Sequence, residues 1–254
     1  FINEEKTALY YGEDFTFTKA ESQEEAAEWV RKLYREQTDL SGIEQVEILC
    51  PFRTEGAVSA LNLNETIRED INPPSEDAPE IACGGKLFRL HDRVMQTKNN
   101  YHIKLHDETG ASVGEGVFNG DIGTVCSVQP DKIEVNYDGR FAEYSKEALD
   151  ELELSYAITI HKSMGSEYDI VIIPLMAAHR ILLSKNLIYT AITRAKRRVL
   201  LIGEKKALYM AIKKNGKGKR NTNLGQRIQL YHKAVTHRPV PGTMVADEKL
   251  KNAS

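Results

Sequence analysis

Apolar positions follow two periodicities in the first and last parts of the chain. Short continuous apolar runs, typical of strands buried on both faces of a parallel sheet, lie at residues 46–50, 169–175 and 198–204. Apolar residues three or four apart predict helices at residues 21–37, 57–70, 155–165, 185–196 and 205–215. Ser22 and Glu25, in the first of these helices, have the spacing of a capping box. Strands that alternate with helices predict an α/β fold with a parallel sheet.

A different pattern occupies the middle of the chain. Short segments with β-branched residues and alternating polarity, separated by turn sequences, lie at residues 93–97, 121–128, 132–138 and 141–145. They predict a small antiparallel barrel of about 55 residues, inserted into the α/β domain. The polar, glycine-rich residues 103–116 predict a flexible insertion within this barrel.

These patterns predict three parts. We expect residues 1–92 and 151–235 to form one discontinuous α/β domain, residues 93–150 to form the barrel, and the polar residues 236–254 to form a disordered tail. The chain opens without a methionine or a signal pattern, so we expect it to be an excerpt from a longer protein.

Composition narrows the class of protein. The chain is 41% hydrophobic and 28% charged, as in ordinary soluble globular proteins, and we expect no membrane span because no apolar run approaches ~20 residues. The formal net charge of −3 means that any contact with nucleic acid requires a local basic surface. Three scattered cysteines without a C-x-x-C motif indicate reduced thiols in a cytoplasmic protein. His102 and His106 lie in a loop-like context that favours two solvated side chains over a metal site.

One motif of nucleotide hydrolases is absent from the sequence. No G-x-x-x-x-G-K-[ST] phosphate loop occurs, since the closest segment, residues 83–87, has Leu87 where the hydroxyl is required. No apolar run leads into an Asp-Glu pair that would hold magnesium. We therefore predict that the chain alone does not hydrolyse ATP.

Two arginines suggest a complementary role. Arg53 follows the apolar run 46–50, and Arg194 lies in the predicted helix before the run 198–204. Ligands of open parallel sheets lie beyond the carboxyl ends of the strands, so both guanidinium groups could converge on one triphosphate. An arginine supplied at the transition state of phosphoryl transfer is worth roughly 10³–10⁵ in rate.

Longer segments resemble a known family. Residues 156–175 and 186–203 resemble motifs V and VI of superfamily 1 DNA helicases, and residues 50–62 resemble motif IV. Residues 88–101 and 117–125 resemble the SH3-like barrel region of the RecD-like branch, which is related to the exodeoxyribonuclease V alpha subunit. Residues 221–228 are similar to the end of that region.

The resemblance implies an ATP-driven motor. In the family, two RecA-like domains bind ATP between them, and single-stranded DNA crosses over both. The chain then corresponds to the second, RecA-like domain with its inserted SH3-like barrel. ATP with Mg²⁺ is held mainly by the N-terminal RecA-like domain, which carries the phosphate loop and the magnesium acids. ATP, single-stranded DNA and that domain are the implied partners.

The resemblance also implies roles for single residues. Arg53 and Arg194 contact the γ-phosphate, Gly165 approaches the phosphate through its amide, and Glu167 reaches the ribose. Thr159 and His161 face the DNA strand or link it to the nucleotide site, and Lys162 is a further DNA contact. By their hydrogen-bonding groups alone, Gln96, Asn99 and Asn100 at the entrance to the barrel could also contact DNA phosphates. Tyr189 and Thr193 support Arg194. Met164 stands where relatives usually carry Gln, and its thioether cannot donate a hydrogen bond, so it either packs or alters the coupling between DNA and ATP.

Each assignment has a simpler alternative. Arg194 can complement a helix dipole, Arg53 can be a surface arginine, His161 can be a satisfied helix histidine, and Glu167 can cap a turn. The amides at the barrel entrance can be structural. A basic cluster can bind phosphates or be a solvated helix end; its members are Lys213, Lys214, Lys217, Lys219 and Arg220. Three aromatic residues can stack bases or pack in the core: Tyr101, Phe118 and Tyr137.

Three functions fit these features. The first is the second motor domain of a DNA helicase, which the paired arginines favour. The second is a non-motor module that binds nucleic acid or protein through the barrel and the basic cluster. The third is an RNA-translocating relative within the same superfamily.

Overall fold

The computed structural model describes residues 12–75 and 78–214. Its centre is a five-stranded sheet with the order β1-β14-β13-β2-β12, in which all neighbouring strands are parallel. The strands are β1 (Phe15–Lys19), β2 (Val46–Cys50), β12 (Ala157–Thr159), β13 (Tyr168–Leu175) and β14 (Ala195–Gly203). The predicted α/β fold with a parallel sheet is confirmed, and β1 is an edge strand that the apolar pattern did not indicate.

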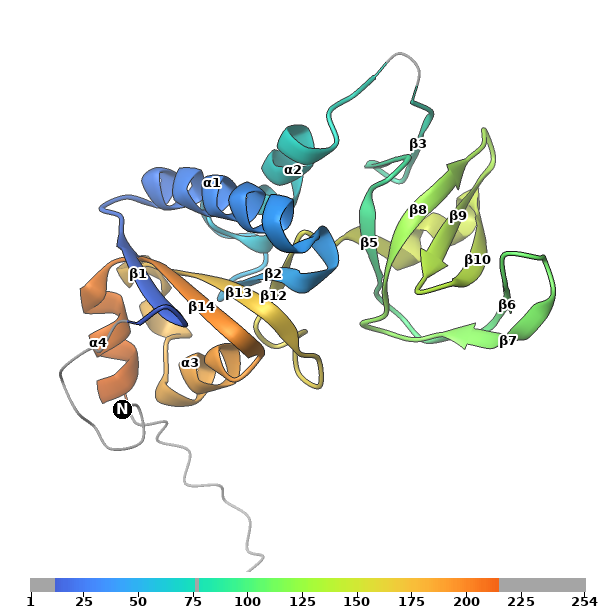
Figure 1. The fold of residues 1–254 in the computed structure, drawn as a ribbon. Coiled ribbons are helices and arrows are strands. Elements are labelled where there is room, and N and C mark those ends of the chain that lie inside the picture. The colour runs from blue at the N-terminus through green and yellow to red at the C-terminus, as the bar shows by residue number, and fades with distance from the viewer. Residues whose placement is uncertain (1–11, 76–77, 215–254) are drawn as a thin grey trace, which may run out of the picture. The chain divides into compact units, whose positions relative to one another are not determined.

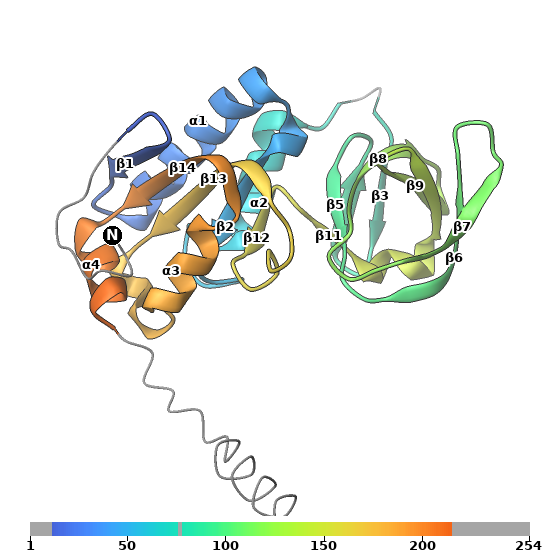
Figure 2. The same ribbon diagram turned by 60° about the horizontal axis from the view of Figure 1, so that its bottom comes forward.

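Helices cover both faces of this sheet (Figures 1 and 2). The helices are α1 (Gln23–Ser41) and α2 (Ala60–Ile71) on one face, and α3 (Lys185–Ile192) and α4 (Lys205–Lys213) on the other. Alternate residues of β13 point into two separate cores, Ile172 toward α1 and α2, and Val171 and Ile173 toward α3 and α4. Burial on both faces explains why β2, β13 and most of β14 are continuous apolar runs.

The amino end of α1 has half of the predicted capping box. The Ser22 hydroxyl accepts a hydrogen bond from the Glu25 amide at 3.1 Å. The Glu25 carboxylate accepts from the Glu21 amide at 2.7 Å, one residue before the one expected. Both orient the first turn of the helix.

A second, antiparallel sheet has seven strands in the order β11-β5-β8-β9-β10-β6-β7. The strands are β5 (Arg93–Gln96), β6 (Asn100–His106), β7 (Ser112–Val117), β8 (Ile122–Val128), β9 (Lys132–Tyr137), β10 (Arg140–Ser145) and β11 (Leu152–Leu154). The hairpin of β3 (Glu80–Cys83) and β4 (Lys86–Arg89) adds Ile81 and Phe88 to the apolar core of this barrel. Short 3₁₀ helices lie at Ile43–Gln45, Lys146–Glu151 and Ala177–Ile181.

The prediction of a flexible insertion at residues 103–116 is wrong. Most of this segment belongs to the β6–β7 hairpin, in which Lys104 pairs with Glu115 and Leu105 with Gly114. Asp107 Oδ1 accepts hydrogen bonds from the Thr109 amide and hydroxyl and from the Ala111 amide, which fixes the turn. Polar residues in this segment form an exposed hairpin instead of a disordered loop.

The prediction of a helix at residues 155–165 is also wrong. Residues 157–159 form β12, which pairs in parallel with residues 48–50 of β2, and turns follow up to Gly165. The open edge of β2 offers unpaired backbone groups to a short strand with a β-branched residue at Ile158. Tertiary pairing therefore overrides the helical spacing in this segment. The predicted helix at 185–196 similarly ends at Ile192, because residues 195–203 join the sheet as β14.

A buried ion pair joins β5 to β2. Arg93 Nη1 lies 3.1 Å from Glu47 Oε2 and donates to the Val46 carbonyl at 3.3 Å. Both side chains are buried, and burial raises the pKa of the Glu47 carboxyl to about 7, although the Arg93 charge acts against this rise. The pair lies near the amino end of β2.

The remaining expectations concern chain ends and membranes. Residues 217, 219 and 220 of the basic cluster, the segment 221–228 and the tail 236–254 lie outside the described residues. Lys214 is described, and its Nζ donates to the carbonyls of Arg180 and Ile181, so it has a structural role. Within residues 12–75 and 78–214, no helix combines the length and apolarity needed to cross a bilayer.

Candidate nucleotide and nucleic-acid sites at two ends of the sheet

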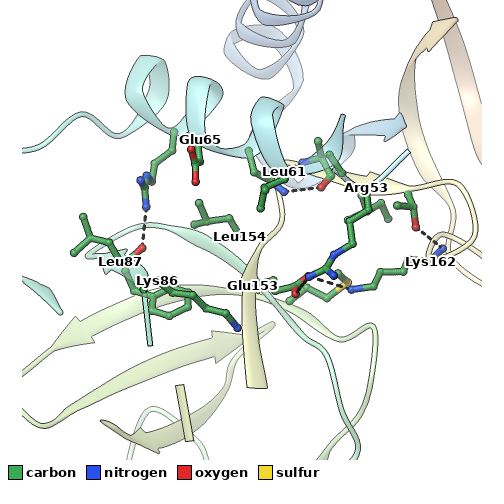
Figure 3. Close-up of a pocket in the computed structure, with 17 residues that line it drawn as sticks. Arg53, Leu61, Glu65, Lys86, Leu87, Glu153, Leu154 and Lys162 are labelled. Carbon is green, nitrogen blue, oxygen red and sulfur yellow. Dashed lines mark hydrogen bonds and ion pairs between the residues drawn. The ribbon is translucent and has the colours of Figure 1, made fainter. Parts of the chain in front are cut away.

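The first group of candidate residues lies at the carboxyl end of the parallel sheet. Thr159 ends β12 beside Cys50, which ends β2, and Arg53 follows β2. Arg53 Nη2 donates to Glu153 Oε1 at 2.5 Å, and Lys162 Nζ lies 3.3 Å from Glu153 Oε2 (Figure 3). The structure therefore brings Arg53, Thr159 and Lys162 together around an acid on β11.

The second group lies at the amino end of the same sheet. Arg194 precedes β14, and its carbonyl accepts from the Tyr168 amide, the first residue of β13, at 2.8 Å. Its guanidinium donates to the carbonyls of Ser166 at 3.0 Å and Thr190 at 3.3 Å, and to the Thr193 hydroxyl at 3.4 Å. Thr193 thus supports Arg194 as expected.

Gly165 and Glu167 belong to this amino-end group. Both are exposed and flank Ser166, which accepts from Arg194. Gly165 has a φ of 96°, a backbone conformation that residues other than glycine rarely adopt. A Cβ at this position would meet open space. The backbone at this position is therefore accessible to a ligand.

The expectation that Arg53 and Arg194 converge is wrong. Strands β2, β13 and β14 are parallel, and Arg53 follows the end of β2 while Arg194 precedes the start of β14. The two guanidinium groups therefore lie at opposite ends of the sheet. A helix that connects two parallel strands returns the chain to the amino end, and Arg194 lies on that return.

Residues 160–167 connect the two ends, because they run from β12 to β13. His161 in this segment is exposed, and Met164 is 64% exposed. Both line a hollow of about 220 Å³ against the start of α3, where Leu187 and Thr190 form the other wall. The exposure of Met164 excludes packing in the core.

The predicted contacts at the barrel entrance are mostly structural. Gln96 is fully buried, and its amide accepts from the Tyr144 hydroxyl and donates to Glu151, so its assignment to a DNA strand is wrong. Asn100 also donates to Glu151, at 3.0 Å. Asn99 is exposed and bonds the Tyr101 hydroxyl and the amide of residue 119. Of the three amides, Asn99 alone has an exposed side chain.

Of the three aromatic candidates, one is buried and two are exposed. Tyr137 is buried, and its hydroxyl lies 2.7 Å from that of Tyr144, so it packs in the barrel core. Tyr101 and Phe118 are 60% and 44% exposed and meet edge to face at 5.6 Å between ring centroids.

Sequence reasoning missed two residues at the carboxyl end. Glu153 is 100 positions from Arg53, so no local pattern indicates the pair. Asn64 is buried on α2; its side chain accepts from the amides of Tyr156 and Ala157 and donates to the Ala157 carbonyl. A polar residue on the apolar face of a predicted helix was the available signal for Asn64.

A buried histidine lies at the carboxyl end. His179 follows β13, and its ring contacts that of Phe52 at 5.3 Å. Its Nδ1 accepts from the Met176 amide, and Nε2 has no hydrogen-bond partner among the described residues. Burial lowers the pKa of His179 to about 4, so the ring is neutral near pH 7.

The structure places the two histidines of the barrel on one strand. His102 and His106 lie on β6 and not in a loop, and His106 stacks on Phe141 with its Nε2 3.2 Å from Glu134. No group of three potential ligands occurs within the described part of the chain. The cysteines Cys50, Cys83 and Cys126 are free.

Two family models match this chain. The SH3 domain of ATP-dependent RecD-like DNA helicases matches residues 63–137, and the UvrD-like helicase C-terminal domain matches residues 154–202. With the parallel sheet and the antiparallel barrel described above, they define the class of protein as a RecA-like helicase domain with an inserted SH3-like barrel.

Two curated relatives and one solved structure are similar to this chain. The ATP-dependent RecD2 DNA helicase of Deinococcus radiodurans is 34% identical over 193 residues, which are 76% of this chain and 25% of that protein. The RecBCD enzyme subunit RecD of Mycolicibacterium smegmatis is 33% identical over 190 residues, 75% of this chain and 30% of that protein. The Pif1 helicase from Bacteroides in complex with ADP-AlF3 and ssDNA has a TM-score of 0.44 and 17% identity, covering 85% of this chain and 55% of that one.

This chain matches the RecD-like helicases in the region of their SH3 and C-terminal domains. It spans 25% to 30% of the length of the two curated relatives named above.

Proposed function

We propose that the chain is the C-terminal motor half of an ATP-dependent DNA helicase that moves along single-stranded DNA and unwinds duplex. Residues 12–71 and 157–213 carry the second RecA-like domain, and the barrel extends from 80 to 154, beyond the predicted bounds of 93 and 150. The observation that carries the proposal is the contact between Arg194 and Ser166, because it joins the two segments that resemble motifs V and VI.

The amino end of the sheet faces the nucleotide in this proposal. An arginine carries five N–H donors, and three of its nitrogens are already oriented by carbonyl and hydroxyl oxygens. These neutral partners fix the guanidinium without neutralising it. Its remaining donors and its charge are available to a γ-phosphate whose negative charge grows in the transition state. Gly165 offers its amide to the phosphate, and Glu167 accepts from the ribose.

The carboxyl end faces the DNA strand. Arg53 and Lys162 contact phosphodiester groups, and Thr159 and His161 lie beside them. Arg53 is therefore reassigned from the nucleotide to the strand, because the parallel strands separate it from Arg194. Asn99 at the barrel entrance is a further strand contact. The segment 160–167 connects both ends, so a change around the nucleotide is transmitted to the strand through it.

ATP and Mg²⁺ require a second domain. The sequence contains no phosphate loop, so the ion and most phosphate contacts belong to an N-terminal RecA-like domain of the same protein. The RecD2 DNA helicase of Deinococcus radiodurans is ATP-dependent by its description, and so is the family whose SH3 domain matches residues 63–137.

The test compares the chain alone with the chain joined to a RecA-like domain that carries the phosphate loop. We expect no DNA-stimulated ATP hydrolysis from the chain alone, and hydrolysis with unwinding once that domain is present. Robust turnover by the chain alone refutes the division of labour. A failure to regain activity in the joined protein favours the non-motor module, and stimulation by RNA but not DNA favours the RNA-translocating alternative.

A further inference from the structure

A pocket lies beside the carboxyl end of the parallel sheet (Figure 3). It has a volume of about 240 Å³ and is enclosed by α2, β4, β11 and β12. Its apolar lining consists of Leu61, Leu87, Phe88, Met95, Leu154 and Ile158. Pockets for drug-sized ligands usually measure about 300–1,000 Å³, so this one suits a smaller group.

The charged residues that line the pocket have an excess of positive charge. Four are basic and two are acidic: Arg53, Arg68, Lys86 and Lys162, with Glu65 and Glu153. The complete chain carries a formal charge of −3, so the pocket is locally basic in a protein that is acidic as a whole. This is the kind of local surface that an anion requires in such a chain.

The cations meet around one carboxylate. Arg53 and Lys162 contact the two oxygens of Glu153 at 2.5 Å and 3.3 Å, from the segments that follow β2 and β12. Lys86 on β4 donates to the carbonyls of residues 150 and 152 at 2.8 Å, and burial lowers its pKa although the Glu153 charge opposes this. An internal carboxylate therefore holds the position that an external anion would take.

A further donor lines the same pocket. Arg68 is 9% exposed, and its Nη1 donates to the Leu87 carbonyl at 2.8 Å. Its Nε is buried and lies 3.8 Å from Glu69 Oε1. The Arg68 guanidinium is therefore held by internal partners, and it contributes positive charge to the pocket wall.

We propose that this pocket receives one unpaired nucleobase of a single strand, whose phosphodiester replaces the Glu153 carboxylate between Arg53 and Lys162. The inference rests on the proposed strand-facing role of the carboxyl end. An apolar interior with a cationic rim matches a nucleotide, which has a planar base and an adjoining anion. The base buries its faces against Leu61 and Leu154.

Equilibrium binding of the chain to two single strands tests the pocket. One is a short oligothymidylate, and the other has the same length and charge but abasic sites in its centre. Burying one base contributes about tenfold in affinity, so we expect the intact strand to bind about tenfold more tightly. Polyglutamate is the control for a purely anionic or acidic-peptide ligand.

Two variants separate the base from the phosphodiester. Leu61→Trp fills the pocket from a position that is already 46% exposed, and we expect it to remove the difference between the two strands. Leu40→Trp, at a position 78% exposed on α1, is the matched control that keeps the difference. Glu153→Gln frees the rim, and we expect it to bind both strands severalfold more tightly. Glu143→Gln makes the same charge change at an exposed pair with Lys132 and should have little effect.

The outcomes distinguish the pocket from the broader assignment. Equal affinity for intact and abasic strands, with Glu153→Gln still effective, overturns the base pocket and leaves the strand-facing end in place. Polyglutamate binding as tight as oligothymidylate also overturns it. Absence of strand binding even in Glu153→Gln overturns the strand-facing role itself, while the Arg194 assignment is tested by hydrolysis alone.

Discussion

The two ends of the parallel sheet hold their arginines in different ways. At the carboxyl end, Arg53 is paired with the acid Glu153. At the amino end, Arg194 is oriented by carbonyl and hydroxyl oxygens, and no ion pair to it occurs within the described residues. Arg53 is ion-paired within the chain, whereas Arg194 keeps its charge without an ion pair among the described residues and in a fixed orientation.

This difference suggests how a motor domain distributes its work. A fixed, uncompensated guanidinium suits an anion that develops charge at one point, because no reorganisation is needed. A guanidinium that exchanges an internal acid for a phosphodiester suits a strand that must be gripped and released. The predictions below test whether the two ends are independent.

The largest effect is expected at the amino end. Arg194→Ala should lower DNA-stimulated ATP hydrolysis about a thousandfold or more in the chain joined to a phosphate-loop domain, because it removes charge from the transition state. Strand affinity should stay unchanged. Arg194→Lys keeps the charge but loses the planar fork, so it should recover little activity. Unchanged turnover in Arg194→Ala removes this residue from the mechanism.

A stability change is expected at the carboxyl end. Asn64→Leu leaves the amides of Tyr156 and Ala157 buried without partners, which should lower the free energy of unfolding by ~3 kcal/mol. Urea unfolding measures this change. Asn62→Leu on the exposed side of the same helix is the control and should cost much less. Equal losses in both variants would show that Asn64 does not hold β12.

The sequence predicted the strands that are buried on both faces. Residues 46–50 and 169–175 were recognised because a central parallel strand buries every side chain, which leaves a continuous apolar run. β12 was predicted as a helix because three strand residues give too short a pattern, and its partner lies in a distant segment. Local periodicity carries no information on such pairing.

The candidate sites were predictable only in part. The motif resemblance selected Arg194 and the segment 159–167, which the structure brings into contact through Ser166. It could not indicate that Glu153 pairs with Arg53, since that contact depends on where β11 lies. It also placed both arginines on one phosphate, because spacing along a chain does not show at which end of a sheet a residue lies.

Acid should lower the stability that His179 contributes at the carboxyl end of the parallel sheet. His179 has a pKa of about 4 in the folded chain and near 6.5 otherwise, so the unfolded state binds the extra proton first. Its contribution to stability is present above pH 6.5 and is lost as the pH falls through 4, by ~3 kcal/mol. His179→Asn keeps an acceptor for the Met176 amide and should remove this loss in thermal unfolding at several pH values. An identical acid loss in the variant would contradict the assignment.

A rise in pH from 4.5 to above 7 should lower the stability that Glu47 contributes at the amino end of the sheet. The pKa of Glu47 is about 7 in the folded chain against 4.5 in its ordinary state, so the folded state holds the proton more tightly. Its contribution is present below pH 4.5 and is lost as the pH rises through 7. The change from 4.5 to about 7 already includes the opposing Arg93 charge and is as large as the change at His179, so the loss should be of similar size. Glu47→Gln should flatten this slope, and a wild-type slope in Glu47→Gln would exclude Glu47 as its source.

The smallest effect is expected from Arg53. Arg53 must leave Glu153 before it can contact a phosphodiester, so its net contribution to strand binding is the difference between these two contacts. Arg53→Gln should therefore weaken strand binding only severalfold. The salt dependence of binding should decrease by about one phosphate contact. Arg35→Gln on the exposed face of α1 makes the same charge change away from the site and should alter neither.

The hydrolysis rate of Arg53→Gln decides between two views of the sheet. If the ends are separate, hydrolysis at saturating DNA should remain close to that of the unmodified chain, since Arg194 is untouched. A collapse of hydrolysis comparable to that of Arg194→Ala would mean that Arg53 contacts the nucleotide. That result would require the segment after β2 to reach across the sheet, and it would end the division between a strand-facing and a nucleotide-facing end.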